Sequence, residues 1–210
     1  SDYAKKSRWF YIPVGSIMKF SQDGNWQFPA GSVWIKHFEL ELERGNPATT
    51  KRIETRFVVK SNFDAFGVSY RWNEDGTEAT LVGKDGVDFD LTIIEEGVQR
   101  NQTWSIPSQS DCLACHTFTS GYVLSFNTRQ LNREMEIDDT VQNMLSYLSD
   151  HEFLDVHLVN PPALPYFARP DDSDASLDFK ARSYLAANCV NCHRPGGTET
   201  DSFDVRPHRT

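Results

Sequence analysis

The residues best suited to chemistry fall in two Cys-x-x-Cys-His motifs, which together use all four cysteines of the chain. Two thiols at this spacing can add to the two vinyl groups on one side of a porphyrin, and the following His then points its imidazole at the iron. The spacing therefore predicts two covalently attached haems of the c type, with each His as a proximal iron ligand. The motifs are Cys112, Cys115 and His116, and Cys189, Cys192 and His193.

Two other uses of the four thiols are open. Together they could form a structural zinc site, but such a site does not require a His after each pair, and the pairs lie far apart in the chain. A disulfide within each Cys-x-x-Cys pair would be strained. Haem attachment accounts for the histidines as well as the thiols, so it is the favoured prediction.

The sixth iron ligands would decide what such haems do, because a Met or His ligand suits electron transfer and an open position suits catalysis or gas binding. Met144 is a candidate for the first haem, since it lies on the apolar face of an expected helix, although a lone Met there commonly packs in the core. His151, just beyond that helix, is another candidate, with a surface or capping role as the alternative. Residues 194–210 contain no Met. The second iron would therefore take its sixth ligand from a missing segment, take it from the first unit or another chain, or remain open.

The first half of the chain, to about residue 105, has the pattern of β-structure. Alternating and β-branched stretches predict strands, and Gly-containing turns separate them. The expected strands cover residues 32–42, 52–59, 66–72, 77–82 and 87–95, with turns at 73–76 and 84–86.

The composition changes after the first motif. Asp138-Asp139 begins a predicted helix that places Val141, Met144, Leu145 and Leu148 on one face. A Pro-rich linker ends in an acidic run, and Ser173 or Asp174 would cap a second helix over about 175–187. On this helix Leu177, Ala181, Tyr184 and Leu185 share a face, and the second motif follows.

These patterns predict an α+β protein, with an antiparallel β-rich N-terminal haem unit followed by a mainly helical, cytochrome c-like C-terminal haem unit. The expected domains are a β-rich haem-binding domain at 1–135, a helix and Pro-rich linker at 136–174, and a partial class I cytochrome c-like segment at 175–210.

Charge and hydropathy limit the partners and the location of this chain of 210 residues. A net charge of −9 argues against nucleic acid and anionic membrane surfaces, and favours a redox partner with a basic patch. No stretch approaches 18 consecutive apolar residues, so no membrane span is expected. The first residues lack the apolar core of a secretion signal. Because haem c is attached outside the cytoplasm, we expect a periplasmic or extracellular protein whose signal was removed, or a piece of a longer polypeptide.

Several segments together resemble an uncharacterised bacterial family of di-haem proteins. The resemblance rests on Ser1-Asp-Tyr-Ala-Lys5, Phe28-Pro-Ala-Gly-Ser-Val-Trp-Ile-Lys36, Ile53-Glu-Thr-Arg56, Trp104-Ser-Ile-Pro-Ser108 with Cys112-Leu-Ala-Cys-His116, Phe126-Asn-Thr-Arg-Gln-Leu-Asn-Arg133 and Cys192-His-Arg-Pro-Gly-Gly197.

This resemblance implies two haem c groups and a place beside, or fused to, sugar dehydrogenases of the glucose/sorbosone type that use pyrroloquinoline quinone. In that family the chain usually continues past the last segment and supplies a Met-Pro type ligand, which residues 194–210 lack. More faintly, the β-half resembles the lysine-crosslinked cytochromes that oxidise hydroxylamine and their cytochrome c′-β relatives. In that resemblance Lys36 would be the crosslink candidate, although a strand Lys is far more often a solvated edge residue.

Three functions are therefore weighed. The first is electron transfer between a dehydrogenase or other cytochrome and a further carrier, with no catalytic residue. The second is a haem enzyme or gas-binding protein with an open iron in the β-rich domain. The third is self-association into a multi-haem conduit or filament, in which a spare His such as His37 or His208 ligates across an interface.

Overall fold

The structure, a computed structural model, describes residues 3–199 and 203–207. The chain forms two compact units that alternate along the sequence. Unit 1 comprises Ser1–Tyr11, Gly31–Ser61 and Ala65–Leu113, and unit 2 comprises Ile12–Ala30, Asn62–Asp64 and Ala114–Thr210. Helix α1 (Gln109–Cys115) carries the chain from the first unit into the second. The α+β class is confirmed, and the expected domain ranges remain a prediction.

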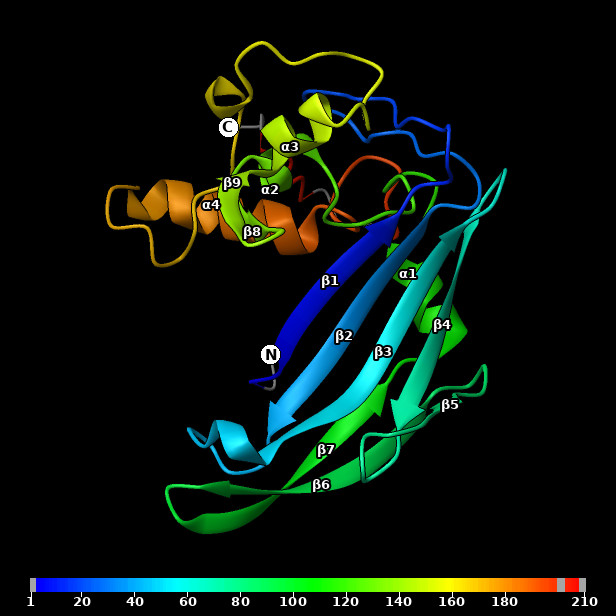
Figure 1. The fold of residues 1–210 in the computed structure, drawn as a ribbon, viewed down its shortest axis with the longest axis vertical. Coiled ribbons are helices and arrows are strands. Elements are labelled where there is room, and N and C mark those ends of the chain that lie inside the picture. Colours follow the sequence, from blue (N-terminus) through cyan, green and yellow to red (C-terminus); the bar gives the residue numbers. More distant parts are fainter. Residues whose placement is uncertain (1–2, 200–202, 208–210) are drawn as a thin grey trace. The chain divides into compact units, whose positions relative to one another are not determined.

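Unit 1 is built on a five-stranded antiparallel sheet with the strand order β1-β2-β3-β4-β5 (Figure 1). The alternating stretches predicted as strands form β2 to β6, and each turn lies where its Gly-containing sequence predicts it. The bounds are β1 (Lys5–Tyr11), β2 (Val33–Glu41), β3 (Thr50–Lys60), β4 (Ala65–Trp72) and β5 (Ala79–Leu81), with a short 3-10 turn η1 (Pro47–Thr49) between β2 and β3. A separate hairpin follows, made of β6 (Val87–Glu95) and β7 (Val98–Ile106).

The core of unit 1 lies between one face of the sheet and the β6–β7 hairpin. Aliphatic and aromatic side chains from both layers are buried there, and Phe38 packs edge-on against Trp104 with ring centroids 5.7 Å apart. Burial of such side chains supplies most of the stabilisation of a sheet of this size. The buried cluster is Phe38, Leu40, Ile53, Ile93, Trp104 and Ile106.

Strand register decides which side chains share a face. Lys36 of β2 lies directly opposite Arg8 of β1 and Arg56 of β3. Its neighbour His37 lies opposite Thr55 and therefore points to the other face, as the period of two predicts. A register shift between Phe38 and Glu39 comes after this row and leaves it intact.

A single buried carboxylate ties the polar side of this core together. Glu54 is fully buried, pairs with the guanidinium of Arg56 through both of its oxygens, and accepts a hydrogen bond of 3.0 Å from Nε1 of Trp104. A buried charge is tolerated when it is paired and hydrogen-bonded in this way.

We expect Glu54→Ala to lower the free energy of unfolding of unit 1 by about 3–5 kcal/mol, because it strands the Arg56 cation and the indole N–H. Denaturant unfolding followed by tryptophan fluorescence would measure the change. Glu74→Ala is the control, since the side chain of Glu74 is 91% exposed and its contact with Lys51 is a surface ion pair. That change should stay within about 0.5 kcal/mol. Equal effects of the two variants would contradict this account of Glu54.

Unit 2 contains short helices, a small hairpin and long connections. Its elements are α2 (Thr128–Leu131), β8 (Glu134–Ile137), β9 (Thr140–Asn143), α3 (Met144–Asp150), the 3-10 turn η2 (Pro161–Ala163) and α4 (Leu177–Cys189). The backbone of Met18 lies beside Leu154 and bonds in both directions. Its N–H donates to the carbonyl of Phe153, and its carbonyl accepts from the N–H of Asp155, so the 12–30 segment is held in this unit.

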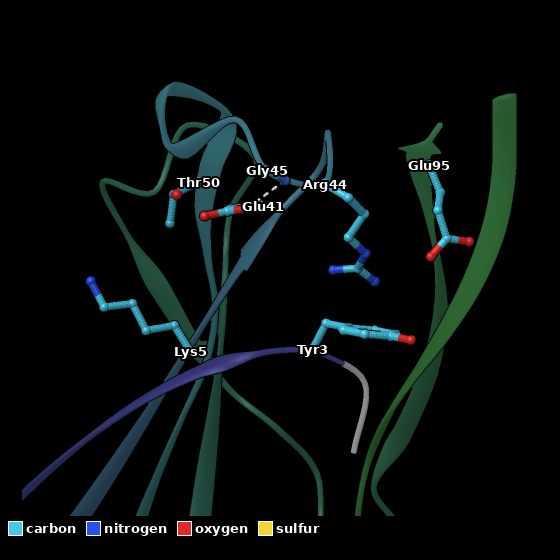
Figure 2. Close-up of a pocket in the computed structure, with 7 residues that line it drawn as sticks. All are labelled: Tyr3, Lys5, Glu41, Arg44, Gly45, Thr50 and Glu95. Atoms are coloured by element: carbon cyan, nitrogen blue, oxygen red, sulfur yellow. Dashed lines mark hydrogen bonds between the residues drawn. The ribbon is translucent and has the colours of Figure 1, made fainter. Parts of the chain in front are cut away.

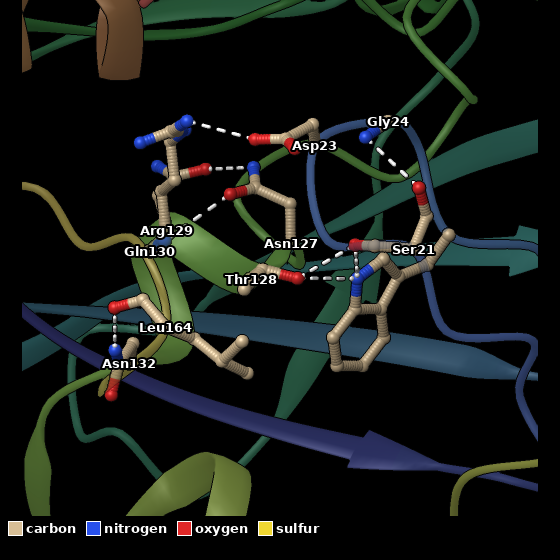
Figure 3. Close-up of polar contacts among 10 residues, drawn as sticks. Ser21, Asp23, Gly24, Asn127, Thr128, Arg129, Gln130, Asn132 and Leu164 are labelled. Atoms are coloured by element: carbon tan, nitrogen blue, oxygen red, sulfur yellow. Dashed lines mark hydrogen bonds and ion pairs between the residues drawn. The ribbon is translucent and has the colours of Figure 1, made fainter. Parts of the chain in front are cut away.

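Polar contacts fasten the 12–30 segment to α2 (Figure 3). The carbonyl oxygen of Ser21 accepts hydrogen bonds from Oγ1 of Thr128 at 2.7 Å and from Nε1 of Trp26 at 2.9 Å. Asp23 pairs with Arg129 at 2.8 Å. Thr128 is almost fully buried, so this network satisfies polar groups that would otherwise be costly to bury.

The helix predicted to begin at Asp138-Asp139 was placed wrongly, because the structure starts it at Met144. Asp138 and Asp139 have φ angles of 49° and 59°, which make the left-handed turn of the β8–β9 hairpin. Val141 therefore lies in β9 and is 68% exposed rather than on a face with Met144. Asn143 caps the helix by accepting hydrogen bonds from the next turn.

The second predicted helix is present as α4, but its cap and its buried face differ from the prediction. Ser176, rather than Ser173 or Asp174, caps it by accepting from the backbone N–H of Phe179 at 3.2 Å. The predicted apolar face is exposed, and the buried residues of α4 are Ser183 and Ala186. Oγ of Ser183 accepts a hydrogen bond from the N–H of Ala168, so the Pro-rich linker covers this side of the helix. The exposed apolar residues are Leu177, Ala181, Tyr184 and Leu185.

Candidate functional site

The first motif begins on α1, against the sheet of unit 1. A Cβ placed on Gly67 of β4 would lie 3.5 Å from Sγ of Cys112, so the glycine allows this thiol to come close to the strand. Burial raises the pKa of the Cys112 thiol above its usual value. Without a bound metal or haem, the Cys112 sulfur is therefore a neutral thiol at neutral pH.

His116 has its ring orientation and tautomer set by one backbone group. Its Nδ1 lies 2.5 Å from the carbonyl oxygen of Tyr122. A carbonyl only accepts, so Nδ1 must carry the proton, and Nε2 keeps the lone pair that a metal would take. Histidines that ligate iron or zinc are oriented in this way by a hydrogen bond from the ring nitrogen that does not bind the metal.

The loop that supplies this carbonyl is braced from within. Oγ of Ser120 donates to the carbonyl of Cys115 at 2.7 Å and accepts from the N–H of Thr117 at 2.9 Å. Tyr122 has a φ of 63°, and its hydroxyl donates to the carbonyl of Phe63 at 3.0 Å. The left-handed backbone at Tyr122 turns its carbonyl toward His116, and the braced loop keeps it there.

The second motif follows the end of α4 in a tight turn. The backbone N–H of His193 donates to the carbonyl of Cys189 at 2.9 Å. A Cβ on Gly197 would overlap the carbonyl oxygen of Cys192, so this turn requires glycine. The chain returns to the motif through Phe203, whose ring centroid lies 5.7 Å from that of His193, and through the N–H of Val205.

His193 differs from His116 in its hydrogen bonding. Its Nδ1 is buried, and no partner for it occurs within residues 3–199 and 203–207. An unpartnered buried nitrogen is costly, by about 1–3 kcal/mol. Within the described residues, the imidazole of His193 therefore lacks the kind of hydrogen bond that sets the tautomer of His116.

The two motifs meet inside unit 2. Sγ of Cys115 lies 3.6 Å from Sγ of Cys192, although the two residues are 77 positions apart in sequence. Oγ1 of Thr198 donates to the carbonyl of Ala114 at 3.1 Å. Together these contacts place the second cysteine of each motif side by side.

Two further side chains tie the same segments together. Oγ1 of Thr119 donates to the carbonyl of Gly196 at 2.8 Å. Asn25 donates from Nδ2 to the carbonyl of Thr119 at 2.9 Å, and its Oδ1 lies 3.4 Å from Nη1 of Arg194. The contact between the motifs is therefore held by several independent hydrogen bonds and does not depend on the sulfur atoms alone.

The candidate sixth ligands lie on α3. Met144 is buried at the start of the helix, where its N–H donates to the carbonyl of Arg133. His151 is the C-cap residue, stacks on Tyr147 with ring centroids 4.1 Å apart, and has Nδ1 2.9 Å from that residue's carbonyl oxygen. Both residues therefore have structural roles, and ligation by either one remains a prediction.

The spare histidines are placed as follows. Nδ1 of His37 lies 2.7 Å from Oγ1 of Thr55, and its ring packs edge-on against Trp72 with centroids 5.8 Å apart. Burial lowers the pKa of His37, which is therefore neutral at neutral pH. His208 lies outside the described residues.

The zinc alternative gains no support from the geometry. Within the part of the chain that the structure describes, no three His, Cys, Asp or Glu side chains converge as metal ligands.

No helix described here combines the length and apolar character needed to cross a membrane.

A polar pocket of about 320 Å³ lies elsewhere in unit 1 (Figure 2). The guanidinium of Arg44 sits over the ring of Tyr3, 4.6 Å from its centroid, and donates to Gln102 at 2.6 Å. Lys5, Glu41 and Glu95 also line it, so acidic and basic groups are mixed there. None of the motif residues lines this pocket.

Searches of protein-family models, curated proteins and solved structures found no match to this chain.

Sequence reasoning identified the thiols and imidazoles but missed what orients them. The carbonyl of Tyr122 carries no side-chain signature, and the Asn25 and Thr119 contacts join segments distant in sequence. The one local signal was the Gly196-Gly197 pair, which marks a tight turn.

The contact between the motifs predicts how the thiols react when no haem is attached. In chain produced without haem attachment, a mild two-electron oxidant should remove one hydrogen from each of Cys115 and Cys192 and join the sulfurs. Peptide mapping by mass spectrometry should find this cross-motif disulfide as the main product, and Cys192→Ser should abolish it. Bonds formed only within each Cys-x-x-Cys pair would contradict the observed proximity.

Proposed function

We propose that this chain is an exported di-haem c-type cytochrome that transfers electrons between a redox protein and another carrier. The observation that carries the proposal is the contact between the second cysteines of two Cys-x-x-Cys-His motifs, with the Sγ atoms of Cys115 and Cys192 3.6 Å apart. Two single-electron sites fixed side by side are what a short relay requires, whereas one isolated motif would give only a single site.

The residues present fit the attachment of two haems. Cys112 and Cys115 would form the thioether bonds of the first, and Nε2 of His116 would bind its iron. Cys189 and Cys192 would attach the second, and the partly buried His193 imidazole would be its proximal ligand. Each haem, when bound, would supply reversible one-electron chemistry whose potential depends on the axial ligands and the surroundings.

The net charge of the chain supports transient binding to a protein partner. The polypeptide has a net charge of −9, to which the haem carboxylates would add, so a partner with a basic docking patch would be attracted and oriented. A periplasmic or extracellular location follows from covalent haem attachment. Kinship with the di-haem proteins that accompany quinone-dependent sugar dehydrogenases, and a cytochrome c-like character of residues 175–210, belong to the same proposal.

The proximity of the motifs predicts electronic coupling between the two haems. The oxidised and reduced proteins should each show a bisignate circular dichroism signal in the Soret band, because the two porphyrins are attached through neighbouring sulfur atoms. Cys189→Ala/Cys192→Ala, which leaves one haem, should convert it to a single-signed band. A wild-type spectrum equal to the sum of the spectra of this variant and of Cys112→Ala/Cys115→Ala would contradict the close pairing.

Carbon monoxide distinguishes electron transfer from the alternative of an open catalytic or gas-binding iron. An electron carrier with both irons six-coordinate should keep its reduced absorption spectrum when carbon monoxide is added. Unchanged spectra for both haems support electron transfer. A shifted Soret band that survives in the Cys189→Ala/Cys192→Ala variant would assign an open iron to the first haem and favour the enzyme or gas-binding function instead.

A further inference from the structure

Three basic residues form a row across the middle of the unit 1 sheet. Register places Arg8 of β1 and Arg56 of β3 on either side of Lys36 of β2. Lys6, two residues before Arg8, lies on the same face. Because β2 and β3 are interior strands of the sheet, Lys36 and Arg56 are only partly exposed, unlike basic residues on a sheet edge.

The heads of two of these side chains are held near each other over one aromatic ring. Nζ of Lys36 lies 5.0 Å from the centroid of Phe38, and Cζ of Arg56 lies 4.7 Å from the same centroid. Arg56 cannot turn away easily, since both oxygens of the buried Glu54 hold its guanidinium. The ring and the carboxylate thus preorganise the two cations.

The row carries more positive than negative charge. Of the charges that act on Lys36, Arg8, Arg56 and Lys6 are basic, and the acidic Glu54 is already engaged by Arg56 and Trp104. Burial, followed by repulsion from Arg8, Arg56 and Lys6, lowers the pKa of Lys36 to about 8. Partly desolvated like charges are unfavourable, so an anion bound among them would be stabilised strongly.

The row lies beside the first attachment cysteine. Gly67 of β4 pairs with Val58, two residues beyond Arg56 on the same face of β3, and the thiol of Cys112 lies against Gly67. The charges of Arg56, Asp111 and Glu54 all act on the Cys112 thiol, and that of Arg56 has the largest effect of the three. Whatever occupies the space beside Cys112 therefore meets these cations.

We propose that Arg8, Lys36 and Arg56 form an anion-binding site for a carboxylate or a small inorganic oxyanion on the sheet face beside Cys112. The row offers guanidinium and ammonium donors on one side, and a guanidinium matches two oxygen atoms at once. The anion has two sources with the same chemistry, the carboxylates of a haem attached at Cys112 or a free oxyanion. The first source rests on the proposed function, and the second does not.

The first arm of the test measures binding of free oxyanions. Nitrite and inorganic phosphate are titrated separately into the protein by calorimetry. The ¹³C-methyl signal of Lys36 methylated at Nζ is followed by NMR. If the anion is free, one of the two should bind and raise the pKa of Lys36. Lys36→Gln and Arg8→Gln should each weaken binding roughly tenfold or more, as expected for loss of a charge-assisted hydrogen bond. Lys5→Gln, on the opposite face of β1, should leave it within about twofold.

The second arm measures the midpoint potential of the first haem in the Cys189→Ala/Cys192→Ala background. If the haem carboxylates occupy the row, no free oxyanion should bind, and Lys36→Gln and Arg8→Gln should both lower the potential while Lys5→Gln does not. Either pattern supports the site and identifies its source.

The site is overturned if Lys36→Gln and Arg8→Gln change neither oxyanion binding nor the potential more than Lys5→Gln does. If the protein lacks haem, the oxyanion titration decides alone, so failure of the proposed function is separable from failure of the site. Arg8 is exposed and supplies a variant that does not disturb the core. Arg56 is left unchanged because its loss would strand Glu54.

Discussion

The hydrogen bonds that join residues 114–119 to residues 192–198 are the constraint on which the candidate site depends. Oγ1 of Thr119 and Oγ1 of Thr198 each reach across to a carbonyl of the opposite segment. Because donors and acceptors come from both segments, neither motif can shift without losing contacts from the other. The proximity of Cys115 and Cys192 is a consequence of this backbone arrangement, and the Asn25 bridge reinforces it from a third segment.

In unit 1, charged side chains lie on a half-buried sheet face, where they need polar or aromatic partners. Glu54 is satisfied by Arg56 and Trp104, and Phe38 provides a ring against which two cations rest. Lys36 and Arg8 add further positive charge to this face, and the charges of Arg56, Asp111 and Glu54 all act on Cys112. The β-rich unit thus does more than present a helix that carries a thiol, because it also determines the electrostatic environment of that thiol.

Much of the fold follows from local patterns in the sequence, and the exceptions have physical causes. Alternation and Gly-containing turns located β2 to β6, since both depend on neighbouring residues alone. The β8–β9 hairpin was missed because Asp138-Asp139 is equally suited to a helix start and to a left-handed turn, and only the left-handed φ angles distinguish the two. The buried side of α4 was missed because a serine, Ser183, anchors it through a hydrogen bond to the linker.

In the candidate site too, the local features could be predicted from the sequence and the tertiary contacts could not. The spacing of Cys and His predicts which atoms would hold a haem, because that requirement is local. The carbonyl of Tyr122 and the meeting of the two motifs depend on tertiary structure, and neither has a signature in the sequence.

The central claim is that this chain carries two covalently bound haems, and intact mass spectrometry under denaturing conditions tests it most directly. The protein should be produced in a host that attaches haem c and exports the chain. The account predicts a mass equal to the polypeptide plus two haems. A mass equal to the polypeptide alone, or to the polypeptide plus one haem, would contradict it.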